Sequence, residues 1–344
     1  MNPGRTFAIA AAIALLLIGG GAFAANRAYN SQVYDARRAG QGVALVDIPA
    51  GASVSEIGDI LSRQGLIGST LAFEIYVRAN GLANRLEAGH YRIRGGLSMA
   101  ATLDLLTHAA GAQVRVTVPE GFTEKQIAQL MEKKGLFNAT AFLDAANKGT
   151  YTQPYLAGRP AGYGLEGYLF PDTYFLDPKA TPAEVISVLL EDFGTKVPAD
   201  LRAHAADQHV TFAQAMVVAS IVEREASFDK DRPYVAAVFY NRLAQGLPLQ
   251  SDATVAYAKG QSTTVITEQD KALNSPFNTY LNTGLPPGPI SNPGLPSIRA
   301  ALMPASGWSY LFFLTDATGH AHFSRTLDQH NQCQVNLSAC PTAP

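Results

Sequence analysis

The sequence has little charge and no excess of basic residues. Only 16% of its 344 residues are charged, 47% are hydrophobic, and the formal net charge is −2. A chain of this length and apolar content can bury a core, so it is globular rather than disordered. Without a basic stripe, nucleic acid is not expected as a partner, and nothing indicates a charge-driven contact with an anionic membrane surface.

The sequence has only two cysteines, and both lie close to the C-terminus. In an exported protein, the pair Cys333 and Cys340 predicts a short disulfide loop that anchors the tail. The alternative is a metal site, because His320, His322 and His330 lie just upstream. Metal sites usually contain closely spaced ligands such as C-x-x-C, which this segment lacks. We therefore expect the disulfide, and neither a metal nor a cofactor.

One long hydrophobic run occurs at the N-terminus, where residues 7–25 contain no charge. A helix of this length, at about 1.5 Å per residue, spans the hydrocarbon core of a bilayer. A cleaved signal peptide is the alternative, because residues 22–24 resemble an A-x-A cleavage site. We expect residues 1–6 in the cytoplasm, a single inner-membrane (cytoplasmic-membrane) anchor, a polar connector over 26–42 and a periplasmic catalytic domain.

A strand-turn-helix pattern occurs twice in the chain. Residues 46–73 align without gaps to residues 116–143, and the identities include the proline and glycine of a Pro-x-Gly turn. Each copy predicts a short strand, this turn and an amphipathic helix that ends at Gly65 or Gly135. The alternative is a chance similarity between two common units. Because the matches fall on turn and cap residues, a true repeat is favoured.

The repeat suggests two domains of mixed α+β structure. Residues 43–113 form a small α+β domain whose units resemble LysM modules, which bind N-acetylglucosamine in cell-wall glycans. Residues 114–344 form a larger α+β domain that begins with the second unit and carries the chemistry. Within it, residues 164–176 predict a rigid wall of a carbohydrate cleft, and residues 274–305 predict a long ordered loop.

The stretch "ASIVEREA" (219–226) places two carboxylates at the end of an apolar run. In a helix over 211–226, Glu223 continues the apolar stripe and Glu225 lies one step off it, so Glu223 is expected to be more buried. A carboxyl among apolar neighbours has a raised pKa, which suits a general acid. The alternative for Glu223 is an ion pair with an arginine such as Arg232 or Arg242.

Polar side chains that suit sugar hydroxyls and N-acetyl groups follow this helix. For each one taken singly, capping of a loop or turn is the alternative explanation. The candidate substrate-binding residues are Glu166, Gln250, Asp252, Asn278 and Tyr280.

Five motifs occur in an order that resembles the endolytic murein transglycosylases, the MltG or YceG-like family. They are "EGYLFPDTY" (166–174), "ASIVEREA" (219–226), "VFYNRL" (238–243), "LQSDATVAY" (249–257) and "FNTYLNTGLPPGPISNPG" (277–294).

The resemblance implies a peptidoglycan lytic transglycosylase, which cuts the β-1,4 bond between N-acetylmuramic acid (MurNAc) and N-acetylglucosamine (GlcNAc) within glycan strands. The muramyl C6 hydroxyl attacks in place of water and leaves a 1,6-anhydroMurNAc end. The family's catalytic glutamate is the first of the two in the motif, which corresponds to Glu223. The implied partners are glycan strands and the inner membrane, with a peptidoglycan synthase as a further candidate if the enzyme terminates nascent strands.

Two other functions stay open at this point, and a third is discounted. If Glu166 or Asp252 is an essential second carboxylate, a muramidase-type hydrolase becomes plausible, although we prefer substrate-orienting roles for both. A membrane-anchored glycan-binding protein would not need Glu223. A pyridoxal-phosphate lyase would need a Schiff-base lysine, which the core motifs lack.

Overall fold

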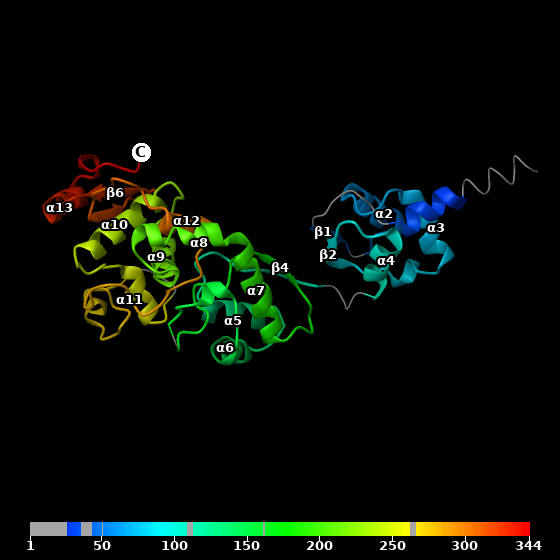
Figure 1. Cartoon of the computed structure of the whole chain (residues 1–344), viewed down its shortest axis with the longest axis horizontal. Helices are drawn as coiled ribbons and strands as arrows, with labels where there is room; N and C mark the ends of the chain where they lie inside the picture. The colour runs from blue at the N-terminus through cyan, green and yellow to red at the C-terminus, as the bar shows by residue number, and fades with distance from the viewer. Residues whose placement is uncertain (1–25, 36–42, 50, 109–112, 161, 262–265) are drawn as a thin grey trace, which may run out of the picture. The chain divides into compact units, whose positions relative to one another are not determined.

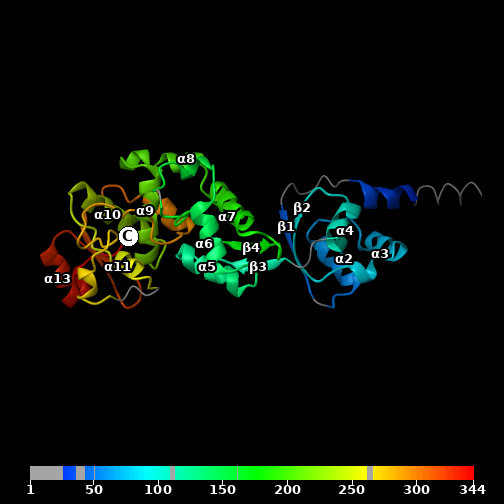
Figure 2. The same ribbon diagram turned by 90° about the horizontal axis from the view of Figure 1, so that it is seen from below.

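The computed structural model describes residues 26–35, 43–49, 51–108, 113–160, 162–261 and 266–344 (Figures 1 and 2). The chain divides into two compact units, one of Met1–Arg115 with Phe175–Pro178 and the other of Val116–Tyr174 with Lys179–Pro344. The mixed α+β class is confirmed.

The expected membrane anchor, residues 7–25, lies outside the described residues. Among those that the structure describes, no helix is long and apolar enough to cross a membrane. Residues 26–34, in the expected connector, are helical, and Val33 is buried in the core of the first unit.

The first unit contains an antiparallel pair, β1 (Val43–Ile48) and β2 (Gly89–Arg94), in register from Val43↔Arg94 to Ile48↔Gly89. Its helices are α2 (Val54–Arg63), α3 (Thr70–Ala79) and α4 (Met99–His108), with a 3-10 turn η1 (Ala83–Arg85). Inward-facing side chains of the strands and helices share one core, because each element alternates or repeats its apolar residues at its own period. The core includes Val46, Ile48, Ile57, Leu61, Phe73, Val77, Tyr91, Ile93, Leu103 and Leu106.

Both copies of the predicted repeat form a strand, a turn and a capped helix. The second copy supplies β3 (Val114–Thr117), α5 (Glu124–Lys133) and α6 (Ala139–Lys148), and β3 pairs with β4 (Thr173–Leu176). Capping boxes begin α2 and α5, where a serine or threonine and an acidic or amide residue three positions later satisfy each other's backbone N–H groups.

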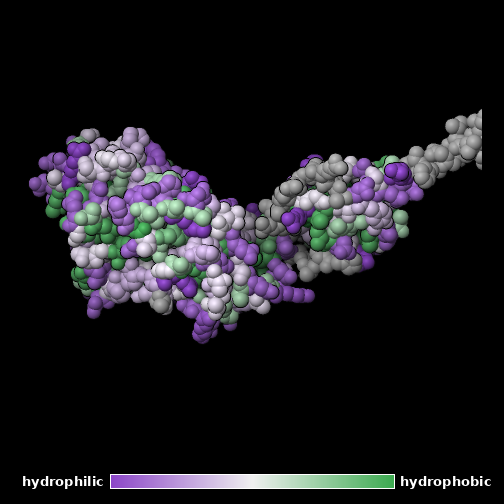
Figure 3. Space-filling model, in the orientation of Figure 1, coloured by the Kyte–Doolittle hydropathy of each residue, from purple (hydrophilic) through white to green (hydrophobic). Residues whose placement is uncertain are grey.

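The rest of the second unit is mainly helical and is built around α9 (Phe212–Glu225), which packs against α10 (Arg232–Ala244), α11 (Asp252–Ala258) and α12 (Leu295–Leu302). Residues 215–222 of α9 are all buried, so this helix has no solvent-facing stripe. On the face shown in Figure 3, hydrophilic side chains cover much of this unit, with smaller hydrophobic areas among them. The remaining elements before α9 are η2 (Pro154–Leu156), α7 (Pro182–Lys196), α8 (Ala199–Ala203) and η3 (Ala206–Gln208).

One expectation about local structure needs correction. The segment 274–305 is ordered, as expected, but it is not entirely a loop. Its last part forms α12, which begins at Leu295 after the N-cap residue Gly294 and has a proline in its first turn. Earlier in the chain, α7 ends at Lys196, because Pro198 disfavours a helical conformation of the residue before it.

The chain ends in a hairpin, a helix and an anchored tail. Strands β5 (Phe312–Thr315) and β6 (Ala321–Ser324) pair antiparallel, and α13 (Leu327–Val335) packs on both. The predicted disulfide between Cys333 and Cys340 is present and links α13 to the residues after η5 (Leu337–Ala339). The backbone N–H of Phe323 donates to the carbonyl of Pro341, so the tail lies beside β6.

Candidate active site

The second unit contains a polar cleft of about 490 Å³. Three of the predicted substrate-binding residues, Gln250, Asp252 and Tyr280, line it. The carboxylate in this cleft from the "ASIVEREA" helix is Glu225, and Glu223 is not among the lining residues. Side chains from α10, β5 and α13 complete the walls, among them Phe239, Arg242, Leu311, Phe312, Phe313, Leu327, His330, Asn331 and Gln334.

Glu225 is the last residue of α9. The Ser251 hydroxyl donates to its Oε1 at 2.5 Å, and the backbone of Ala253 also hydrogen-bonds it. Burial raises the pKa of the Glu225 carboxyl, and the nearby negative charge of Asp252 raises it further. A carboxyl of this kind can hold a proton at a pH where an exposed glutamate has lost it.

The neighbours of Glu225 are held by hydrogen bonds from three segments. The Tyr280 hydroxyl donates to Asp252 Oδ1 at 2.5 Å, and Arg242 Nη2 donates to Gln250 Oε1 at 2.5 Å. Gln250 has a positive φ of 55°, which is uncommon for a residue other than glycine and is often found at functional sites. With its carbonyl oxygen bound to Arg242, the Gln250 amide nitrogen is the group left to face a ligand.

Asn278 was predicted to bind substrate, but it does not line the cleft. Its side chain is enclosed, with the amide donating to the carbonyls of Lys271 and Leu273 at 2.9 and 2.8 Å. Its Oδ1 accepts from the backbone N–H of Tyr280 at 3.0 Å. Asn278 therefore binds the backbone of Lys271 and Tyr280, two residues that line the cleft. The Asn278 side chain has to be buried to make these contacts.

Glu166 also lies outside the cleft, in a buried network. It is 5% exposed, and its carboxylate accepts from the backbone N–H of Glu124 and from the side chains of Asn292 and Tyr257. Burial and the charge of Glu124 raise the pKa of Glu166 well above its usual value. With its oxygens bound to protein groups, Glu166 connects α5 to the 166–174 motif and does not orient a ligand in this cleft.

Glu223 lies on the other side of the last turn of α9. Its Oε2 accepts from Arg232 Nη1 at 3.1 Å and from the backbone N–H of Gly294 at 3.0 Å, and the two paired side chains are 7% and 6% exposed. The alternative considered for Glu223, an ion pair with Arg232, is therefore present. Arg232 also donates to Asp229 and to Ser297. We call Glu223, Arg232 and Gly294 the clamp.

A further carboxylate, that of Glu120, lies beside the clamp. A Cβ added at Gly294 would come within 1.9 Å of Glu120 Oε1. Burial raises the pKa of Glu120, and the charge of Glu223 adds to the shift. Glu120 belongs to the Pro-x-Gly turn of the second repeat, so this turn contacts the end of α9.

The remaining motif residues hold the long loop against α9. Ser220 accepts from the backbone N–H of Ile290 at 3.0 Å, and its carbonyl accepts from Ser291 at 3.1 Å. Asn292 Oδ1 accepts from the backbone N–H groups of Gly167 and Leu169, both at 2.9 Å. Segments that are more than 100 residues apart in sequence thus meet at one helix. The segment 164–176, expected to form a cleft wall, is part of this buried support.

Comparison with known proteins agrees with the order of these motifs. The sequence model of the YceG-like family matches residues 46–336. The chain belongs to the YceG-like family.

Relatives of this YceG-like chain have a named activity. The chain is 34% identical over 302 residues to the endolytic murein transglycosylase of Bacillus subtilis (strain 168). The match covers 84% of this chain and 83% of that protein. The chain is 30% identical over 316 residues to the endolytic murein transglycosylase of Streptococcus pneumoniae (strain D39), covering 83% of this chain and 57% of that protein. The crystal structure of a YceG-like protein from Listeria monocytogenes superposes with a TM-score of 0.57 at 33% identity, covering 85% of this chain and 99% of that one.

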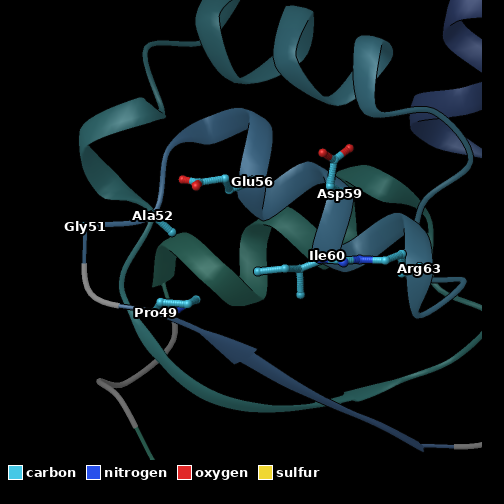
Figure 4. A pocket seen from close by; sticks show the side chains of 7 residues that line it. All are labelled: Pro49, Gly51, Ala52, Glu56, Asp59, Ile60 and Arg63. Atoms are coloured by element: carbon cyan, nitrogen blue, oxygen red, sulfur yellow. The ribbon is translucent and has the colours of Figure 1, made fainter.

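The first unit of the YceG-like chain has a smaller pocket of about 330 Å³ (Figure 4). It is lined by Pro49, Gly51, Ala52, Glu56, Asp59, Ile60 and Arg63. None of these lining residues is aromatic, and Glu56 is engaged in the capping box of α2. The cleft with Glu225 therefore has the better-developed chemistry.

Ser251 and Lys271 are polar residues of the cleft that were not singled out from the sequence. Ser251 lies inside the "LQSDATVAY" motif, so its position in that motif was the available signal. Lys271 has no motif around it, and only the structure brings it to the cleft.

Proposed function

We propose that this chain is an endolytic murein transglycosylase that uses Glu225 as its catalytic acid and base. It cleaves the β-1,4 bond between MurNAc and GlcNAc within glycan strands and leaves a 1,6-anhydroMurNAc end. Membership of the YceG-like family and the named activity of its relatives support the reaction. The observation that carries the assignment of the acid is the half-buried Glu225 carboxyl, with its raised pKa, in a polar cleft.

The environment of Glu223 supports a different role. Its Oε2 is bound by Arg232 and by the backbone N–H of Gly294, so the side chain is engaged in a buried ion pair outside the cleft. Glu225 instead has a hydroxyl and a backbone group as hydrogen-bond partners, and burial favours its neutral form. The first glutamate was expected from the family resemblance, so the choice between the two is a proposal that experiment must decide.

The reaction needs one carboxyl group, which gives up one proton and later takes one back. Protonated Glu225 gives its proton to the glycosidic oxygen as the C1–O bond of MurNAc breaks. The C6 hydroxyl of the same MurNAc attacks C1 and forms the 1,6-anhydro ring. The Glu225 carboxylate takes the proton from O6 and is ready for the next cycle, so no water is consumed.

Gln250, Asp252 and Tyr280 orient the substrate in this scheme. The Asp252–Tyr280 hydrogen bond keeps Asp252 in place beside Glu225 and fixes the Tyr280 ring as part of the wall. Glu166 is unsuited to the role of a second catalytic carboxylate, because protein groups occupy its oxygens outside the cleft. If Asp252 activated water instead of orienting sugar, the products would carry reducing ends.

The cellular setting is part of the same proposal. Residues 7–25 anchor the chain in the inner membrane, and the second unit acts in the periplasm on strands that are still close to the membrane. Cleavage there would terminate nascent strands, and a peptidoglycan synthase is the candidate partner. The first unit, as a LysM-like module, would contribute a further contact with the glycan.

The decisive experiment uses three forms of the protein on purified peptidoglycan. The wild type, Glu225→Gln and Glu223→Gln are incubated with the same sacculi, and the soluble products are identified by mass spectrometry. We expect internal cuts with anhydro ends from the wild type and from Glu223→Gln, and none from Glu225→Gln.

Other product patterns would change the assignment in defined ways. Reducing ends from the wild type would indicate a hydrolase. Binding without cleavage by any form would favour the glycan-binding protein. An inactive Glu223→Gln beside an active Glu225→Gln would return the catalytic role to the first glutamate.

A further inference from the structure

Lys271 lies in the cleft and has no task in the reaction described above. It belongs to the 3-10 turn η4 (Asp270–Ala272) and lines the same cleft as Glu225. Its Nζ lies 5.1 Å from the centroid of the Tyr280 ring and 2.6 Å from Glu268 Oε1. Its position is therefore defined by an aromatic face on one side and a carboxylate on the other.

A short chain of contacts connects this cation to the catalytic acid. Asn278 donates to the Lys271 carbonyl and holds the Tyr280 backbone, so one buried amide fixes both residues. Tyr280 in turn donates to Asp252, the residue after the Ser251 that binds Glu225. A ligand group that reaches Lys271 is thus in the same cleft as the Glu225 carboxyl.

The other basic side chains of the cleft are less available to an anion. Arg242 donates its Nε, Nη1 and Nη2 to the Pro248 and Leu311 carbonyls and to Gln250. Burial and the Arg242 charge lower the pKa of His330, so its ring is neutral at pH 7. The partner of Lys271, Glu268, has a side chain that is 88% exposed. An ion pair this exposed contributes little, so a ligand carboxylate can replace it.

We propose that Lys271 binds a carboxylate of the peptide stem on the muramyl unit and makes the enzyme selective for peptide-bearing glycan. The inference rests on the proposed function. In murein the stem is attached through a lactyl ether at O3 of MurNAc, the same sugar whose C1 is attacked. The lactyl carboxyl is used in the amide bond to the stem, so a free stem carboxylate lies further along the peptide and can reach a side chain set apart from the reacting ring. Binding of the stem carboxylate by Lys271 would position the MurNAc ring in the cleft. It would also distinguish strands that carry stems from strands that have lost them.

The test compares three glycan substrates with the full chain. The first carries stems with free carboxylates, and the second carries the same stems with their carboxylates amidated. The third has its stems removed by an amidase, and the lactyl carboxylates that this exposes are then amidated as well. Lys271→Met keeps an unbranched side chain over Tyr280 but removes the charge. Lys271→Arg keeps the charge, and Lys133→Met, an exposed lysine on α5, is the matched control.

We expect Lys271→Met to lower kcat/KM about 10-fold on the first substrate and less than about twofold on the other two, since a charge-assisted hydrogen bond is lost only there. Lys271→Arg should restore most of the difference, and Lys133→Met should have no effect. An equal loss on all three substrates would mean a structural role, and no loss on the first would mean no role; either result overturns the inference. If the wild type cleaves none of the three, the proposed function itself fails.

Discussion

The two sides of the last turn of α9 hold the same residue type in opposite environments. Glu223 faces the clamp, where Arg232 and a backbone N–H bind one of its oxygens. Glu225 faces the cleft, where Ser251 donates to it and the nearest acid is Asp252. Burial raises the pKa of the Glu225 carboxyl even though the charge of Arg224 lowers it. Two positions along one helix thus place one carboxylate in a buried ion pair and the other in a cleft.

The largest expected effect is on catalysis, where replacing Glu225 should lower kcat far more than replacing Glu223. Glu225→Gln removes the proton that the leaving oxygen needs, so kcat should fall by about 10³-fold or more. Glu223→Gln should lower kcat by no more than about 10-fold, because it acts only through the position of Glu225. Steady-state rates of anhydro-end formation measure both. Equal losses would show that the two sides of the turn are not functionally distinct.

The free energy of unfolding should depend more on Glu223 than on Glu225. Glu223→Gln leaves the buried Arg232 with only the exposed Asp229 as a counter-charge and should lower the free energy of unfolding by about 3 kcal/mol. Asp144→Asn, which removes the exposed partner of Lys148 on α6, is the control and should cost less than about 1 kcal/mol. Urea denaturation of both variants gives the comparison. A clamp variant as stable as the control would mean that the clamp does not hold the fold.

The wall of the cleft opposite α9 depends on the C-terminal disulfide. Replacing Cys333 and Cys340 by serine opens a loop with a sequence separation of 7, which should destabilise the tail by about 2 kcal/mol. Because α13 carries His330, Asn331 and Gln334, we expect a raised KM for glycan with kcat nearly unchanged. Hydrogen exchange should increase in α13 and the tail. Adding a reductant should reproduce the effect in the wild type and change nothing in the variant.

The smallest effect expected is a pH-dependent difference in stability. Burial raises the folded-state pKa of Glu225 above its usual 4.5, so its contribution to stability is present below pH 4.5 and is lost as pH rises through the folded pKa. Glu225→Gln cannot ionise and should become more stable than the wild type over that range, by at most about 1.4 kcal/mol per pH unit.

Glu184→Gln provides a comparison of opposite sign in the same unit. Hydrogen bonds from Thr181 lower the pKa of Glu184, so its contribution appears as pH rises and is lost as pH falls through the folded pKa. Thermal melts at several pH values measure both variants. A Glu225→Gln variant that follows the wild type at every pH would contradict the buried environment assigned to Glu225.

Helical periodicity predicted α9 and the burial of the Glu223 side chain, which is 6% exposed, but not which glutamate faces the cleft. The prediction assumed one apolar stripe, whereas residues 215–222 are buried all round. When every side of a helix is enclosed, spacing no longer says which side faces a cleft. Gln250, Asp252 and Tyr280 were found because they lie in motifs with suitable polar groups. Glu166 and Asn278 came from similar motifs but are buried, and burial depends on segments that close over them.

Most of the local structure could be predicted from the sequence. The Pro-x-Gly turns, the capping boxes and the glycines at 65 and 135 specify the same strand, turn and helix twice, because each signal acts within a few residues. The chemical identity of the site depended on the tertiary structure. Arg232 and Gly294 reach Glu223 from the starts of α10 and α12, while Ser251 reaches Glu225 from the start of α11. Contacts between such distant segments decide which carboxylate is held by an arginine and which one faces the cleft.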